Sequence, residues 1–156
     1  MEAKPHKAIL APVPSVHLES AFGLKSDIIA FGTNDCKFFD DAELTEGVGK
    51  IVVYIFASTT GGPSPLHKPG HVVAIGTYLG YERADKYGQH RNASERPLSA
   101  RNEDTPWVGY WRVSDLKKLS LPTPFSSIGL YPKDGIGKIR KYKGPPHGPT
   151  LIVGPR

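Results

Sequence analysis

Cysteine and long apolar runs are both scarce in this sequence. The 156 residues include one cysteine, Cys36, which excludes an internal disulfide and a cysteine-rich zinc site. No apolar run approaches the ~20 residues that a membrane-spanning helix needs. The first residues also lack the charged-then-apolar layout of a secretory signal. These absences predict an intracellular protein, and we expect a cytoplasmic one that makes no contact with a membrane.

The common motifs of catalysis are missing as well. The sequence has no G-x-S-x-G, no phosphate-binding G-x-x-x-x-G-K-[ST] and no H-E-x-x-H. Its closest histidines, His67 and His71, lie in a Pro/Gly-rich turn and are interpreted as solvated residues rather than metal ligands. The adjacent acids Asp40 and Asp41 fit a helix start, where the helix dipole favours negative charge. We therefore predict a non-enzymatic protein with no catalytic residues, no metal and no cofactor.

Glycine and proline, by contrast, are abundant. The chain holds 17 Gly and 15 Pro, which indicates many turns and little long helix. Its length suits one domain with a single core. We expect residues 1–156 to form one domain.

Several apolar, β-branched segments predict strands. Residues 50–58 form the most continuous of these runs, as expected for a central strand covered on both faces. The other predicted strands are an edge strand broken by Pro12 and Pro14 and followed by a turn, then residues 27–34, 71–81, 107–119 and 149–156, with helix-start signals over 40–47. Gly76 and Gly80 predict a bulge or tight curvature in the strand that holds them. The predicted class is α+β: a small curved sheet or partly open barrel of five or six strands with one to three short flanking helices.

Two segments carry no strand pattern. Residues 82–104 form a polar loop that is long for a compact domain, and this loop is either a mobile insertion or a segment that orders on binding a partner. The C-terminal segment at 133–148 is rich in bases, with Lys138, Arg140, Lys141 and Lys143 as candidate phosphate contacts. A solvated tail without function is the alternative for that segment.

Aromatic residues cluster in "WVGYW", residues 107–111. Side chains alternate between the faces of a strand, so Trp107, Gly109 and Trp111 share one face and Tyr110 lies on the other. Two rings on one face can hold a flat base by stacking. Tyr110 and Trp111 are the candidates for core packing, because tryptophan is highly buried on average. Trp107 follows a proline and a polar loop, so it is the stronger candidate for a binding role.

The chain resembles the PUA-like superfamily over about residues 28–130, in particular its EVE and YTH branches. The resemblance rests on "GKIVVYIFASTTGG", "PGHVVAIGTYLGYERAD", "DTPWVGYWRVSDLKKLSLPTPFSSI" and the "FGTN" turn at 31–34. It implies a small curved β-sheet or barrel with flanking helices. It also implies a pocket for a flipped-out base, formed by Phe31, Thr33, Asn34, Ser58, Thr59, Trp107 and Tyr110, with Trp111 as the alternative to Tyr110 for the second aromatic wall.

The function implied by this resemblance is recognition of a modified base, with methylation as the expected modification. The partner would be nucleic acid, DNA rather than RNA, and a nuclease or motor protein would supply any cleavage, as in McrBC-type modification-dependent restriction systems. Three alternatives stay open at this point. They are an RNA-binding YTH-like reader, an ASCH-like hydrolase of a modified nucleoside, and a protein-interaction domain whose aromatic strand docks a partner chain.

Overall fold

One mixed β-sheet organises the chain. The structure is a computed structural model, and it describes residues 7–24, 26–40, 51–58, 70–101, 106–127, 129–130, 140–141 and 149–153. The five strands of six or more residues are, in sheet order, β2 (Ile28–Thr33), β5 (Gly109–Pro124), β4 (His71–Arg83), β3 (Val52–Ser58) and β1 (Lys7–Pro14). Three short strands continue the sheet beyond β1: β8 (Thr150–Val153), β6 (Gly129–Leu130) and β7 (Arg140–Lys141).

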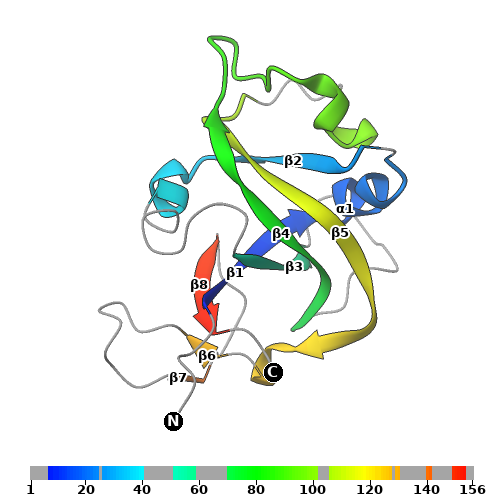
Figure 1. The fold of residues 1–156 in the computed structure, drawn as a ribbon, viewed down its shortest axis with the longest axis vertical. Helices are drawn as coiled ribbons and strands as arrows, with labels where there is room; N and C mark the ends of the chain where they lie inside the picture. The colour runs from blue at the N-terminus through cyan, green and yellow to red at the C-terminus, as the bar shows by residue number, and fades with distance from the viewer. Residues whose placement is uncertain are drawn as a thin grey trace.

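The pairing of the strands leaves the sheet open. β1 and β3 are parallel and every other described pair is antiparallel. The sheet order ends at β2 and β7, so the described strands do not close into a barrel. Figure 1 shows β4 and β5 crossing the molecule as a long pair, with β2 at one end of it. The predicted α+β class, a small curved sheet with few helices, is confirmed.

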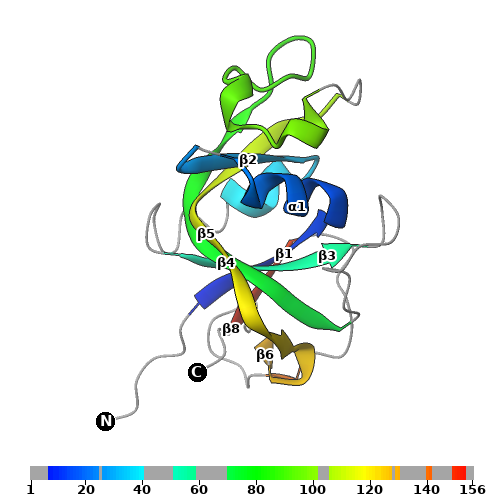
Figure 2. The ribbon, with the colours of Figure 1, turned by 90° about the vertical axis from the view of Figure 1, so that its right-hand side faces the viewer.

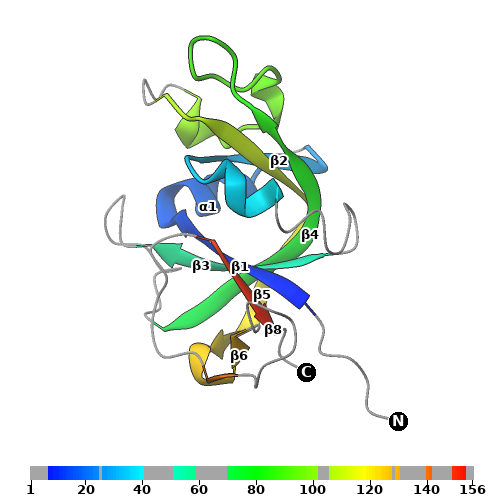
Figure 3. The same cartoon turned by 90° about the vertical axis from the view of Figure 1, so that its left-hand side faces the viewer.

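The helices are short. α1 (Ser15–Phe22) follows β1 directly, residues 36–40 form a helical segment, and three 3-10 turns occur at Ala93–Glu95, Leu98–Ala100 and Phe125–Ser127. Figures 2 and 3 show α1 between β2 on one side and the β1–β3 pair on the other. No helix in the described ranges has the length and apolar character needed to cross a membrane.

Alternation along β1 divides the core into two clusters. Ile9 and Ala11 pack in the larger cluster with α1 and the inner faces of β2 to β5. Ala8 and Leu10 point the other way, into a smaller cluster that includes Phe56 and Phe125. Because successive side chains of a strand face opposite sides, β1 is apolar on both faces. β3 also contributes to both clusters, in agreement with the expected doubly covered strand at 50–58.

Glycines set the curvature of β4 against β5. The β4–β5 register shifts between Ile75 and Thr77 and again between Tyr78 and Gly80, at the two glycines expected to mark bulges. A Cβ on Gly76 would lie 2.3 Å from Val113 Cγ2, and Gly80 has a φ of 111°. Both positions exclude larger residues, so the curvature of the sheet is encoded locally.

The N-terminal prediction was wrong in two respects. β1 is an interior strand between β3 and β8 rather than an edge strand, and α1 follows it where a turn was expected. Ser15, Leu18 and Ala21 are the buried residues of α1, at the helical spacing of three. No side chain caps the first turn of α1. Packing of this buried face against the rest of the protein is therefore the main source of the helix's stability. The predicted helix over 40–47 lies outside the described residues except for Asp40.

A pocket between β1 and β2 as the candidate functional site

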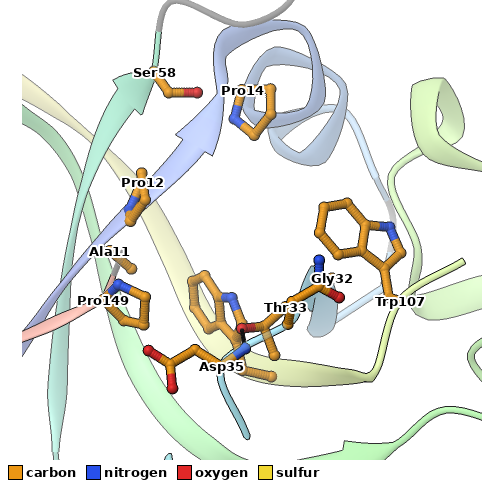
Figure 4. Close-up of a pocket in the computed structure, with 11 residues that line it drawn as sticks. Ala11, Pro12, Pro14, Gly32, Thr33, Asp35, Ser58, Trp107 and Pro149 are labelled. Carbon is orange, nitrogen blue, oxygen red and sulfur yellow. Dashed lines mark hydrogen bonds between the residues drawn. The ribbon is translucent and has the colours of Figure 1, made fainter. Parts of the chain in front are cut away.

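The candidate site lies in the opening of the sheet. β1 and β2 face each other across it without being paired strands. Pro12 and Pro14 line it from β1, and Gly32 and Thr33 line it from β2 (Figure 4). The pocket has a volume of about 630 Å³, within the usual range for small-molecule sites.

Prolines suit the wall that β1 provides. β8 pairs with β1 only from Lys7 to Leu10, so beyond Leu10 the edge of β1 on that side has no neighbouring described strand. Proline carries no backbone N–H, so Pro12 and Pro14 leave no unpaired donor at such an edge. Pro12 and Pro14, which led to the prediction of an edge strand, thus border the pocket.

Trp107 forms the opposite wall, and its indole lies face-on against β2. A Cβ built on Gly32 would be 2.5 Å from Trp107 Cδ2 and Cε2 and 2.6 Å from Cγ, so only glycine permits this packing. The Trp107 backbone N–H donates to the Gly88 carbonyl at 3.1 Å. Its indole Nε1–H is buried and has no hydrogen-bond partner among the described residues. In Figure 4 the six-membered ring of Trp107 projects toward the centre of the pocket.

Trp111 also lines the pocket. It is only 3% exposed, and its ring centroid lies 5.0 Å from that of Phe31 and 6.1 Å from that of Phe39. Trp111 is therefore a core residue that also borders the cavity. Trp107 and Trp111 line the same pocket, but Trp107 lies before the first residue of β5, Gly109, so the predicted strand over 107–119 begins two residues later than expected.

Polar groups come from the turn that ends β2. The Asn34 side-chain oxygen accepts from the Val108 N–H at 3.2 Å, which ties this turn to the segment that carries Trp107. Thr33 Oγ1 accepts from the Asp35 N–H at 3.0 Å, and Asp35 Oδ1 accepts from the Phe38 N–H at 3.2 Å. Asp35 therefore caps the helical segment at 36–40 with one carboxylate oxygen.

Asp35 gives the pocket its charge. Among the described lining residues it is the one charged side chain, and its carboxylate appears at the pocket in Figure 4. Ser58 adds a hydroxyl from the end of β3, beside its register partner Pro14. A carboxylate, a hydroxyl and an amide beside two indoles suit a flat ligand that donates hydrogen bonds. The same carboxylate disfavours a phosphate inside the pocket.

Four of the residues expected to bind the base line this pocket: Thr33, Asn34, Ser58 and Trp107. The structure does not bring Phe31 and Tyr110 to it. Phe31 is 4% exposed and packs against Trp111, whereas Tyr110 is 1% exposed and its hydroxyl donates to the Gly88 carbonyl at 2.7 Å.

The remaining predicted contacts are not placed. Thr59, Lys138 and Lys143 lie outside the described residues, and Arg140 and Lys141 are described only as the backbone of β7. No expected phosphate contact of the C-terminal segment therefore has a described side chain.

Sequence reasoning missed Asp35 and the prolines of β1 as pocket residues. Asp35 follows Asn34 in the turn already singled out, so its position was a usable signal. Of the two candidates for the second aromatic wall, Trp111 lines the pocket and Tyr110 does not. The prolines were interpreted only as strand breakers, because nothing local shows that β1 borders an unpaired neighbour.

A cluster of ion pairs and hydrogen bonds connects the polar loop to β2 and β5. Arg112 donates to Glu95 from Nε at 2.9 Å and from Nη2 at 3.0 Å, and His90 Nε2 lies 3.0 Å from Glu95 Oε1. Arg96 donates to the Ala30 carbonyl of β2 at 2.6 Å, and its guanidinium lies 4.8 Å from the Tyr110 ring centroid. These bonds connect residues 90–96 to β2 and β5, so this part of the polar loop is held against the sheet.

The electrostatics of that cluster centre on Glu95. Burial acts to raise the pKa of Glu95, but hydrogen bonds from Arg112 and His90, together with their charges, outweigh it and lower the pKa below its usual value. The same pairing with Glu95 raises the pKa of Arg112. Both groups therefore stay charged over the neutral pH range.

Comparisons with known proteins assign no family to this fold and pocket: no protein-family model matches the chain, and no curated protein matches it. Within the described ranges, no group of three or more His, Cys, Asp or Glu side chains is placed to hold a metal ion.

Proposed function

We propose that the protein is a binding module that takes a modified nucleobase of a nucleic acid, extruded from its stack, into the pocket between β1 and β2. The observation that carries this proposal is the convergence of Trp107, Asn34 and Ser58, from three separate parts of the chain, on one pocket.

The aromatic wall would supply most of the affinity. One face of the Trp107 indole packs on Gly32, and the opposite face would stack on a flat ring. Stacking of a base on an aromatic side chain contributes about 1–3 kcal/mol as measured by alanine substitution. Trp111 would limit the depth of the pocket, because it is fixed in the core by Phe31 and Phe39.

The polar groups would recognise the edge of the base. Asp35 has one oxygen engaged by the Phe38 N–H, and its second oxygen would accept from an amino or imino group of the base. Ser58 stands on the opposite wall and would bond a second position. Phosphates of the same strand would remain outside the pocket, where contacts to them add affinity without base identity.

The free energy of binding must exceed the cost of extruding the base. Unstacking and unpairing cost a few kcal/mol, and least for a single-stranded or mismatched base. The stacking on Trp107 and the edge contacts must offset that cost. Single-stranded ligands should consequently bind more tightly than duplexes of the same sequence.

The experiment is a titration of methylated and unmodified oligonucleotides, as DNA and as RNA, at two salt concentrations. Trp107→Ala should weaken binding of the preferred modified ligand by roughly 5- to 150-fold and binding of the unmodified ligand much less. Val108→Ala is the matched control, because Val108 is the neighbouring residue, is 46% exposed and does not line the pocket. An equal loss on both ligands, or no loss on either, would rule out a base-reading pocket.

A further inference from the structure

The polar loop also contains an exposed tight turn. Residues 85–88 form a tight turn in which Asp85 Oδ1 accepts from the N–H groups of Tyr87 and Gln89, each at 2.9 Å. The backbone closes the same turn, since the Gly88 N–H donates to the Asp85 carbonyl and the Asp85 N–H donates to the Gln89 carbonyl, each at 2.9 Å. Four hydrogen bonds in five residues make this a preorganised turn.

The turn presents an aromatic ring and a cation together. Tyr87 is 70% exposed, and Lys86 Nζ lies 5.0 Å from its ring centroid. A single exposed apolar side chain needs no explanation by itself. What sets Tyr87 apart is that a rigid turn holds it and a lysine accompanies it.

Gly88 connects this turn to the pocket wall. Its carbonyl accepts from both the Trp107 N–H at 3.1 Å and the Tyr110 hydroxyl at 2.7 Å. Gly88 has a φ of 77°, and a Cβ there would lie 2.5 Å from Pro106 Cβ, so the close approach requires glycine. Tyr87 is therefore one residue from the backbone that holds Trp107 in place.

The cations exposed at this turn suit a polyanion. Residues 82–104 hold five Lys or Arg and five Asp or Glu, of which the structure describes all five bases and three of the acids. Each of the three acids is already engaged: Glu82 with Arg91 at 2.6 Å, Glu95 with Arg112, and Asp85 with the turn. Lys86 and Arg83 are exposed, so positive charge accompanies Tyr87 on this turn.

We propose that Tyr87 and Lys86 form a second nucleic-acid contact beside the pocket. Tyr87 stacks on a base that neighbours the extruded one, and Lys86 contacts a phosphate of the same strand. The identity of the polymer rests on the proposed function, but the contact itself does not require a modified base. It gives a role to the long polar loop, which the pocket alone does not explain.

The test compares two ligands, the free modified nucleoside and a single-stranded oligonucleotide that contains it. Tyr87→Ala should weaken oligonucleotide binding by roughly 5- to 150-fold and leave nucleoside binding unchanged, while Tyr87→Phe should retain most of the affinity. Lys86→Gln should reduce the slope of log K against log salt by roughly 0.7. Leu98→Ala is the matched control, an exposed apolar residue of the same loop at 59% exposure, and should bind as wild type.

Two outcomes would overturn this contact. One is an unchanged oligonucleotide affinity in Tyr87→Ala. The other is an equal loss on the nucleoside, which would mean that Tyr87 acts through the pocket wall. Failure of the pocket itself gives a different pattern: nucleoside does not bind and Trp107→Ala has no effect, while unmodified single strands still bind in a manner that depends on Tyr87.

Discussion

Gly32→Ala tests how the pocket wall is built. The added Cβ would lie 2.5–2.6 Å from three atoms of the Trp107 indole, whereas ordinary contact begins near 3.4 Å, so the ring must move by about 1 Å. Rotation about χ2 alone does not relieve this, because Cγ lies on the axis of that rotation and is among the three atoms. The ring must therefore turn about χ1 or the backbone must shift, and a backbone shift would strain the hydrogen bonds from the Trp107 and Val108 N–H groups to Gly88 and Asn34.

The magnitude follows from two opposing effects. Overpacking costs about 1–3 kcal/mol, and replacing a strand glycine with alanine returns about 0.5–1 kcal/mol. The free energy of unfolding should fall by about 0 to 2.5 kcal/mol. Binding should suffer more, approaching the roughly 5- to 150-fold loss expected for Trp107→Ala, because the displaced ring no longer presents its free face.

Two measurements on one preparation separate these effects: denaturant unfolding and calorimetric titration with the modified oligonucleotide. Gly23→Ala is the matched control, because the nearest atom to its added Cβ is the Ser20 carbonyl oxygen at 3.7 Å and its φ is −87°. This control should keep wild-type affinity. If Gly32→Ala also kept wild-type affinity and stability, the face-on packing of Trp107 against β2 would be refuted.

The remaining predictions concern ionisation. Glu95→Gln should destabilise the protein by about 1–3 kcal/mol at neutral pH. Because folding lowers the pKa of Glu95, its stabilising contribution is present above about 4.3 and is lost as the pH falls toward the folded-state pKa. Unfolding curves of wild type and variant should therefore converge in acid, and a constant difference would contradict the ionic role. Separately, the hydrogen bond from Tyr81 to Asp40 raises the pKa of Tyr81 to about 12. Asp40→Asn should lower it toward 10, as followed by NMR of the Tyr81 ring carbon, and an unchanged titration would refute the pairing.

The main strands were predictable because their signals are local. Apolar, β-branched runs at 50–58, 71–81 and 107–119 correspond to β3, β4 and β5, and Gly76 and Gly80 correctly marked the irregular register. β5 extends through the proline-rich connector to Pro124, since its long pairing with β4 outweighs the turn preference of those residues.

The site was predictable only in part, because it depends on contacts between distant segments. The proline and polar loop before Trp107, and the turn motif at 31–34, pointed to Trp107 and Asn34, but the opening between β1 and β2 follows from sheet order, which no local pattern specifies. The contacts of the polar loop also depend on distant residues. Glu95 pairs with Arg112, 17 residues away, and such ion pairs leave no periodic trace in the sequence.

The most direct test of the central claim uses the two indole N–H resonances of this chain, which contains two tryptophans. Trp107→Phe assigns them. On titration with the modified nucleoside, the Trp107 resonance should shift with saturation and the Trp111 resonance should shift less, and the unmodified nucleoside should produce much smaller changes at equal concentration. If the Trp107 resonance stayed fixed, or moved equally with both nucleosides, the pocket between β1 and β2 would not be a reader of modified bases.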